Sequence, residues 1–429
     1  MLDRTDARHT PMARTVAGMA AGNFVEWYDF AIYSYSIPTI SRLFFPEGNA
    51  VAALLSTLAI LAVSFLFRPM GGVFFGQLGD RIGRRNSLVI ALLLMGGCTT
   101  AIGLLPTYAI AGLAAPVLLA ICRLGQGFSG GGETSGSATF LAEHAPRNHR
   151  GTWVALGGAT QVMPFAVAAL LIYALQGAMS VEQFQDWGWR LPFLLSAPMS
   201  LVALFLRSRL KDSPVFAALE QSGRVESSPI KRVLSDHKRE LALLIGIASV
   251  SSAGFYTITS YLSLFLQTHA GFSYPDALAA NSIGIAFYSV AYACFGVISD
   301  RIGRKRVILA AAVGLLIMAT PGFLTASQGG IVYAVLGQLM MIVPLAAASS
   351  VVAVVQCELF PPAVRFTGAA LGFNIAYALF GGTAPLVAEY LVMVTSNAMA
   401  PAYYLMALAS FALIPMALLP ETSKKSMEY

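Results

Sequence analysis

Charged residues are scarce in this chain. Asp, Glu, Lys and Arg make up 11% of its 429 residues, whereas soluble domains carry about 25%. Hydrophobic residues make up 57%, and the mean hydropathy is +0.69. The length alone would suggest about three soluble domains, but so few charges cannot cover their surfaces. The composition therefore predicts an integral membrane protein.

Cysteine and histidine are also few, and the usual nucleotide motifs are missing. Four cysteines and five histidines show no paired spacing, which argues against a disulfide framework and a metal site. A phosphate-binding Gly-x4-Gly-Lys-Ser/Thr loop does not occur, so we do not expect ATP to supply the energy. Gly125, Gly127 and Gly130 match a dinucleotide fingerprint, but they lie in an apolar run with no preceding strand. We therefore expect neither an enzyme nor a bound cofactor.

Apolar runs recur along the whole sequence. A helix of about 20 residues crosses the ~30 Å hydrocarbon core of a bilayer. Twelve such runs cover residues 16–40, 51–78, 87–106, 112–142, 151–177, 190–207, 241–267, 277–299, 306–325, 330–358, 366–394 and 401–419. A membrane β-barrel would show short alternating segments instead. We predict an all-α membrane protein with twelve transmembrane helices.

The basic residues are distributed unevenly between the two sides that these runs define. If the N-terminus is cytoplasmic, 23 of the 27 Lys and Arg residues fall in cytoplasmic segments, as the positive-inside rule requires. Arg4, Arg8 and Arg14 precede the first run, which is too long and too acidic for a signal peptide. We predict a multi-pass protein of the inner membrane with both termini in the cytoplasm. The basic excess then reflects topology and not nucleic-acid binding.

Two patterns recur at nearly the same offset. Gly76-x3-Asp80-Arg81-x-Gly83-Arg84-Arg85 returns 220 residues later as Gly296-x3-Asp300-Arg301-x-Gly303-Arg304-Lys305. Glu143-x2-Pro146-x3-Arg150 returns 215 residues later as Glu358-x2-Pro361-x3-Arg365. Such repetition indicates a duplicated unit. We predict two pseudo-symmetric six-helix halves, residues 1–207 and 241–429, joined by a cytoplasmic linker at 208–240.

These loop motifs resemble the signature of the major facilitator superfamily. Further stretches are similar to its metabolite:proton symporter branch: Gly22 to Phe30, Phe67 to Gly72, Gln126 to Glu133, and Trp187 to Phe193. The resemblance implies transport by alternating access, with the bilayer, protons and a small molecule as partners of a monomeric unit. Members of this branch carry 2-oxoglutarate, citrate, shikimate, other carboxylates, proline or betaine, so we expect a small organic acid or a zwitterion.

Ionisable residues inside the apolar runs are candidates for the transport mechanism, because each costs at least ~2.5 to 3.5 kcal/mol to insert. The first half contains Glu26, Asp29, Arg68, Arg123 and Glu133, whereas the second contains only Glu389. We expect Arg68 to lie near the cytoplasmic end and to reach water along its own stem. Charge handling is therefore expected in the first half.

A carboxylate that pairs with a guanidinium in only one conformation changes its proton affinity as the protein moves. We predict that Asp29 is the proton carrier and Arg123 its partner, with Glu26 and Glu133 as rivals. The resemblance supports this pair, because sugar:proton symporters place an Asp and an Arg in comparable spans. The alternative is that these residues form structural ion pairs.

Polar and aromatic residues in the spans are substrate-site candidates, because transporters bind their substrates near the midplane. The candidates are Asn23, Tyr33, Gln126, Gln161, Tyr256, Tyr288, Asn374 and Tyr377. The resemblance implies a cytoplasmic gate of ion pairs formed by Asp80, Arg81, Arg84, Arg85, Glu143, Arg150, Asp300, Arg301, Arg304, Lys305, Glu358 and Arg365. We predict proton-coupled symport, with a proton-independent uniporter or exchanger as the alternative. Drug:proton antiport is less favoured, because the fifth run lacks its pattern.

Overall fold

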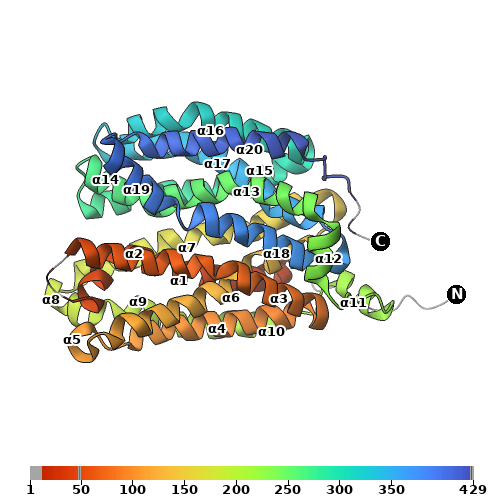
Figure 1. Ribbon diagram of the computed structural model, residues 1–429, viewed down its shortest axis with the longest axis horizontal. Helices are drawn as coiled ribbons and strands as arrows, with labels where there is room; N and C mark the ends of the chain where they lie inside the picture. The colour runs from red at the N-terminus through yellow and green to blue at the C-terminus, as the bar shows by residue number, and fades with distance from the viewer. Residues whose placement is uncertain (1–11, 47, 49, 426, 428–429) are drawn as a thin grey trace.

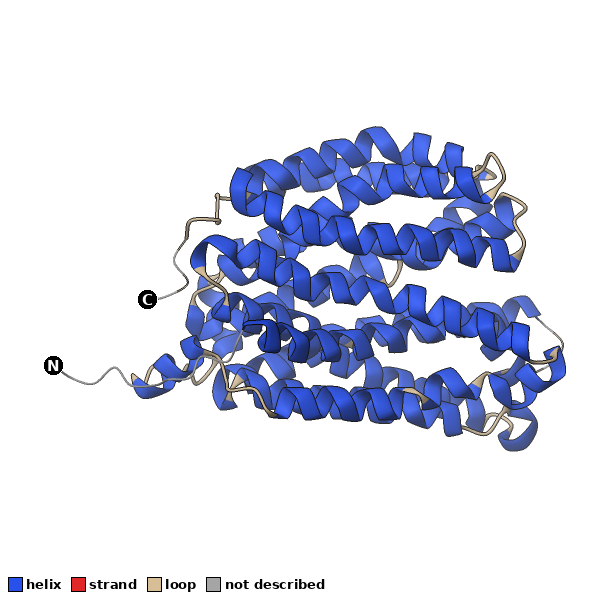
Figure 2. Ribbon diagram, turned by 180° about the vertical axis from the view of Figure 1, so that it is seen from behind, coloured by secondary structure: helices blue, strands red, loops and turns tan. Residues whose placement is uncertain are grey.

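The computed structural model describes residues 12–46, 48, 50–425 and 427. Helices joined by short loops form the whole of this described part, and it contains no strand (Figure 2). Arg4 and Arg8 lie outside the described residues. The helices run nearly parallel to one long axis (Figure 1), as expected when each apolar run crosses the same bilayer.

The first half of the chain forms six membrane spans. Its long helices are α1 (Met12–Phe44), α2 (Ala50–Leu66), α3 (Arg68–Ile82), α4 (Arg84–Leu104), α6 (Ala114–His144), α7 (Arg150–Ala178) and α10 (Ser196–Ser208), with short α5 (Tyr108–Ala111), α8 (Val181–Gln183) and α9 (Arg190–Leu194). Helices α2 and α3 together form the second span, and α9 and α10 form the sixth. The helices α11 (Pro214–Gln221) and α12 (Pro229–Asp236) follow and connect the two halves.

The second half forms the other six spans. Its helices are α13 (Lys238–Tyr256), α14 (Leu262–His269), α15 (Tyr274–Ile302), α16 (Arg304–Ala326), α17 (Ile331–Leu359), α18 (Arg365–Ala376), α19 (Ala384–Thr395) and α20 (Ala400–Leu418). Short π-helical turns at Thr257–Tyr261 and Tyr377–Gly381 divide the seventh and eleventh spans. The predicted boundaries at 207 and 241 stay a prediction.

The twelve-helix prediction is confirmed. Ten spans of the described chain are long and apolar enough to cross a membrane by length and composition alone. The other two, α1 and α6, are 33 and 31 residues long. They carry Glu26 and Asp29, and Arg123 and Glu133, respectively. Helices of mixed polarity can span a bilayer when their polar side faces the interior of the bundle.

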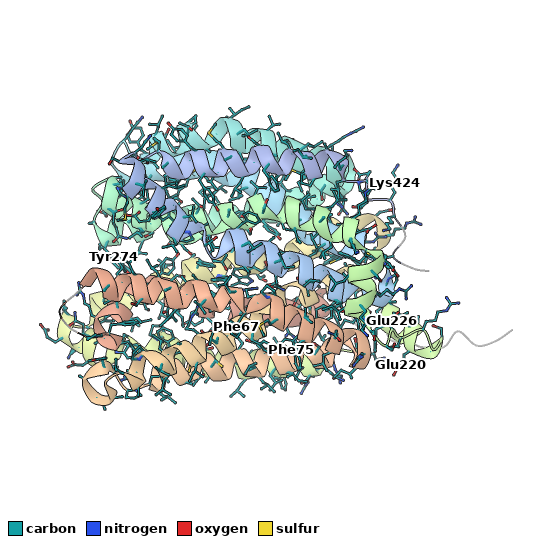
Figure 3. The ribbon with its side chains drawn as sticks, viewed as in Figure 1. Phe67, Phe75, Glu220, Glu226, Tyr274 and Lys424 are labelled. Atoms are coloured by element: carbon teal, nitrogen blue, oxygen red, sulfur yellow. The ribbon has the colours of Figure 1, made fainter. Side chains whose placement is uncertain are left out.

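The two halves pack side by side around a central interface (Figure 1). Helix α7 packs along α15, and α3 packs along α18, so both contacts join the first half to the second. Helices α11 and α12 lie at one end of the bundle, and α5, α8 and α14 lie at the other. Figure 3 places Glu220, Glu226 and Lys424 at the first end, here called the basic end, and Tyr274 at the opposite, far end.

The repeated loop motif forms the same local structure in each half. Gly83 and Gly303 separate consecutive helices with φ angles of 100° and 105°, a conformation that favours glycine. Asp212 accepts hydrogen bonds from the backbone N–H groups that begin α4, and Glu421 does the same at the start of α16. A carboxylate at a helix N-terminus compensates the positive end of the helix dipole. The second half therefore repeats the first in its capping contacts as well.

Candidate functional site

Four charged side chains join the halves at the basic end and form the first gate cluster: Asp80, Arg84, Glu143 and Arg365. Arg84 lies 3.1 Å from Asp80 and 3.5 Å from Glu143. Arg365, from the second half, approaches Glu143 to 3.0 Å. Asp80 also accepts a 3.0 Å hydrogen bond from the backbone of Thr367. All four charged side chains are buried, so the cluster is a closed contact between the halves.

The second gate cluster repeats this arrangement with the halves exchanged. It consists of Arg150, Asp300, Arg304 and Glu358. Arg304 lies 2.9 Å from Asp300 and 3.3 Å from Glu358, and Arg150 of the first half lies 3.4 Å from Glu358. Asp300 accepts hydrogen bonds from the backbone N–H groups that begin α7. The interface at the basic end is therefore closed by two symmetry-related sets of ion pairs.

Four residues expected in the gate lie outside both clusters. Arg81 and Arg301 are exposed, and Arg85 and Lys305 are partly exposed. Within the described chain none of the four forms an ion pair with an acidic side chain. Each of the four directly follows a cluster member in the sequence, so on the helix its side chain points to a different side.

The segment after α20 completes the second gate cluster. Thr422 donates a 2.6 Å hydrogen bond to Glu358, and the carbonyl of Lys425 accepts one from Arg150 at 2.9 Å. Burial alone would raise the pKa of Glu421, but hydrogen bonds from the N–H groups of Ser423 and Arg304 hold that pKa below its usual value. Glu421 is therefore held in its charged form at the helix terminus that it caps.

Arg68 occupies the centre of the interface. Its Nη2 atom lies 2.8 Å from Glu26 and donates to the carbonyl of Gly130, while its Nε atom donates to Asn374 at 3.2 Å. The side chain is completely buried. The expectation that Arg68 reaches water at the cytoplasmic end is wrong. It lies 12 residues, or about 18 Å along a helix, from Asp80, which places it near mid-membrane.

Asp29 and Arg123 lie near each other but do not form an ion pair in this conformation. Asp29 accepts hydrogen bonds from the hydroxyls of Thr99 and Ser196. Arg123 donates to Gln126 at 2.8 Å, and Gln126 donates to Thr99 at 2.5 Å. A chain of two polar side chains thus connects the buried carboxylate to the buried guanidinium.

Glu133 and Arg207 form a buried ion pair between α6 and α10. Two hydrogen bonds of 2.8 and 2.5 Å join them. The sequence did not single out Arg207, because this residue is the last of the apolar run 190–207 and was counted among the cytoplasmic basic residues. The available signal was its place at the end of an uninterrupted apolar run, one turn before Lys211.

Six aromatic side chains surround the central arginine and form the aromatic cluster: Trp27, Phe30, Phe65, Phe255, Tyr256 and Tyr377. The Arg68 guanidinium lies 5.2 to 5.7 Å from the ring centres of the first three. The ring of Trp27 lies 5.0 Å from that of Phe255 and 6.2 Å from that of Tyr256, both of the second half. Trp27, Phe30, Phe65 and Phe255 were missed, because aromatic residues are frequent throughout this sequence.

Several polar atoms in this region have no hydrogen-bond partner among the described residues. They are Arg68 Nη1, Trp27 Nε1, Tyr256 Oη and Arg123 Nε. Leaving a buried donor unpaired costs about 1 to 3 kcal/mol, so a ligand that paired with these groups would gain affinity. The adjoining cavity measures about 20 Å³, room for about one water molecule. The centre is therefore closed in this conformation.

The substrate-site candidates fall into two groups. Gln161 and Tyr377 line the central cavity, and Tyr256 belongs to the aromatic cluster beside it. The hydroxyls of Tyr288 and Ser349 share a hydrogen bond of 2.9 Å, and the side-chain amide of Asn374 donates to the carbonyl of Gly131 across the interface. The remaining three, Asn23, Tyr33 and Gln126, bond to Gly157, to Thr57 and to Arg123, all within the first half.

Tyr35 joins the halves toward the far end. Its hydroxyl donates to the carbonyl of Thr259 at 3.1 Å and accepts from Asn281 at 3.3 Å. The π-helical turn at Thr257–Tyr261 shifts the local hydrogen-bond pattern where this carbonyl accepts side-chain donors. A vestibule of about 660 Å³ lies outside Tyr35 and is also lined by Arg42 and Tyr274. Tyr35 thus separates this vestibule from the closed centre.

The structure has two six-helix halves with a buried charged centre between them, a closed contact on one side and a vestibule on the other. This arrangement is that of a membrane transporter. The sequence comparison agrees, because the family model of the Major Facilitator Superfamily matches residues 19–382. The chain belongs to this superfamily, whose named relatives here are transporters and not enzymes.

Similar proteins carry names that refer to proline, betaine and ectoine. The chain is 32% identical over 434 residues to a proline/betaine transporter of Salmonella typhimurium, covering 97% of this chain and 85% of the relative. It is 34% identical over 429 residues to the ectoine/proline transporter ProP of Corynebacterium glutamicum, covering 96% and 84%. The structure of the proton:xylose symporter XylE bound to 6-bromo-6-deoxy-D-glucose matches with a TM-score of 0.79 at 19% identity, covering 97% of each chain. At this low identity, the match to XylE supports the fold alone.

Proposed function

We propose that this protein is a proton-coupled symporter of a small zwitterion in the inner membrane, with the basic end in the cytoplasm. The observation that carries the proposal is the unpaired Nη1 donor of Arg68 inside the aromatic cluster. A carboxylate would satisfy this donor through a charge-assisted hydrogen bond. The aromatic faces would stabilise a cationic nitrogen on the same molecule.

A zwitterion fits this centre better than a di- or tricarboxylate does. Glu26 already compensates the positive charge of Arg68 at 2.8 Å, so the pair has no net charge to offset a substrate that is itself net negative. A second guanidinium adjoins this cluster, that of Arg123 at 5.1 Å from the Phe30 ring, but it already donates to Gln126 and Ser64. The aromatic faces suit a compact ammonium group. The names of the relatives, which mention proline, betaine and ectoine, support the same substrate class.

We assign proton coupling to Asp29. Away from the gate clusters, the described part of the first half has three buried acids. Glu26 pairs with Arg68 and Glu133 pairs with Arg207, each at 2.8 Å or less. Asp29 has only hydroxyl partners. Because a carboxylate without a cation is costly in a dry interior, it binds a proton more readily than the two paired acids do. Movement of Thr99 and Gln126 would bring Arg123 to Asp29 and release the proton.

The closed basic end defines the half of the cycle that the structure represents. Both gate clusters are formed, and Tyr35 still closes the path from the vestibule. Breaking the Tyr35 contacts would admit the substrate from outside, and breaking the gate clusters would release it inside. The two events cannot coincide in a transporter that keeps a proton gradient, which is the requirement of alternating access.

Uptake into proteoliposomes tests the proposal. With an inward proton gradient we expect accumulation of proline, glycine betaine or ectoine, and none of 2-oxoglutarate, citrate or shikimate. Asp29→Asn should abolish accumulation but keep exchange of substrate across the bilayer, whereas the exposed Asp186→Asn should behave as wild type. Uptake that is unchanged when the gradient is collapsed, and that only equalises the substrate concentrations on the two sides, would instead support a uniporter or exchanger, which remains the second candidate function.

A further inference from the structure

A groove on the surface of the second half is separate from the transport site. It lies between α15, α16 and α17 and has a volume of about 570 Å³. Its lining is apolar with one exception, Arg306, at the basic end of α16. Arg306 is exposed, and it forms no hydrogen bond or ion pair with the described residues. An apolar groove that ends in an unpaired cation suits a ligand with an apolar body and an anionic head.

The internal repeat shows that this groove is a feature of one half only. At an offset of 220 residues, Ala310 and Gly314 of α16 correspond to Ile90 and Leu94 of α4. Those larger side chains are 44% and 37% exposed and project from the first half at the equivalent place. Arg306 corresponds to Asn86, which has no charge. Smaller residues and a cation thus occur together, and only in the second half.

The length of the groove matches one leaflet. Along α16 it extends from Arg306 to Met318, a distance of about 18 Å at 1.5 Å per residue. Half of the hydrocarbon core is ~15 Å thick. An acyl chain that enters from the basic end would therefore reach the bilayer midplane and stop there, with its headgroup beside Arg306.

We propose that this groove binds an anionic phospholipid of the leaflet at the basic end. One acyl chain lies along Ala310 and Gly314, and the headgroup phosphate pairs with Arg306. Basic pockets between helices on the cytoplasmic side favour such headgroups, since the anionic leaflet and the cation attract each other. The groove is distinct from the proposed zwitterion site, which lies at the interface between the halves.

Native mass spectrometry of the purified full chain tests this proposal, with dioleoylphosphatidylglycerol and dioleoylphosphatidylcholine as the added probes. We expect one tightly bound phosphatidylglycerol and weaker binding of phosphatidylcholine. Arg306→Gln should reduce phosphatidylglycerol affinity roughly fivefold, or about 1 kcal/mol, and abolish the preference. Ala310→Ile, which copies the first half, should reduce binding of both lipids. Arg301→Gln, at an exposed position at the end of α15 and outside the groove, is the matched control.

Three results would overturn the proposal. Equal binding of the two lipids to the wild-type chain would remove the role of the headgroup charge. An Arg301→Gln variant that loses as much affinity as Arg306→Gln would show general attraction to a basic surface. Unchanged binding in Ala310→Ile would show that the acyl chain does not occupy the groove.

Discussion

The ion pair between Glu143 and Arg365 gives the sharpest test of the gate. It crosses from one half to the other at 3.0 Å, and both side chains are almost completely buried. Glu143→Gln keeps the shape of the side chain but leaves two buried guanidinium groups, of Arg84 and Arg365, without this carboxylate. Removing one partner of a buried pair costs about 3 to 5 kcal/mol. Opening the gate lets Arg365 reach water, so the variant favours the open gate by roughly a hundredfold or more.

The chain contains a natural reporter of this opening. Cys357 is completely buried, and its thiol lies 3.7 Å from the hydroxyl of Thr139 across the interface. In a background where the other cysteines, Cys98, Cys122 and Cys294, are replaced by serine, maleimide can label only this thiol. We expect Glu143→Gln to raise the labelling rate of Cys357 about a hundredfold, or to the rate of a fully exposed thiol.

A surface pair provides the control for this measurement. Glu226 and Arg232 lie 2.8 Å apart at an exposed site, where an ion pair contributes about 0 to 1 kcal/mol. Glu226→Gln should therefore leave the labelling rate within a few-fold of the parent. If Glu143→Gln labels no faster than Glu226→Gln, the cluster does not hold the halves together, and the gate assignment is refuted.

Three further perturbations follow from the contacts described. Arg68→Lys loses the planar donor set, so we expect the affinity for substrate to fall about tenfold or more. Intrinsic tryptophan fluorescence measures this affinity, and an unchanged value would place the substrate elsewhere. Tyr35→Phe removes a hydroxyl whose hydrogen bonds join the halves and contribute about 0.5 to 1.5 kcal/mol. The distance between spin labels at Thr39 and Gln267, measured by double electron–electron resonance, should therefore shift toward longer values. Because the pKa of Glu421 is lowered, its contribution is present above its usual value near 4.3 and is lost as the pH falls through the lowered pKa. The ratio of the wild-type maleimide labelling rate to that of Glu421→Gln, measured at each pH, should therefore rise below about pH 4.

The architecture could be predicted because two simple patterns determine it. Apolar runs long enough to cross a bilayer predicted every span, and the structure confirms the twelve. The repeated loop motif predicted matching halves, which share a buried arginine at positions 84 and 304. Helix boundaries near 82 and 302 follow from the glycines at 83 and 303, whose backbone conformation ends one helix before the next begins.

The centre of the site was harder to predict, because partner choice depends on packing between helices that are distant in sequence. Asp29 and Arg123 were expected to pair, and the structure places Thr99 and Gln126 between them in this conformation. Arg68 was placed at the wrong depth, since a single run hid the junction between α2 and α3. Nothing in a one-dimensional pattern shows that a guanidinium from the first half reaches Asn374 of the second.

The pairing of Glu133 with Arg207 has a consequence for how the protein is made. The two residues are 74 positions apart, and chains are synthesised at about 5 to 20 residues per second. For roughly 4 to 15 s after Glu133 leaves the ribosome, its countercharge does not yet exist. During that interval α6 has to wait beside the translocon, or be shielded by earlier helices, until the sixth span arrives to neutralise it.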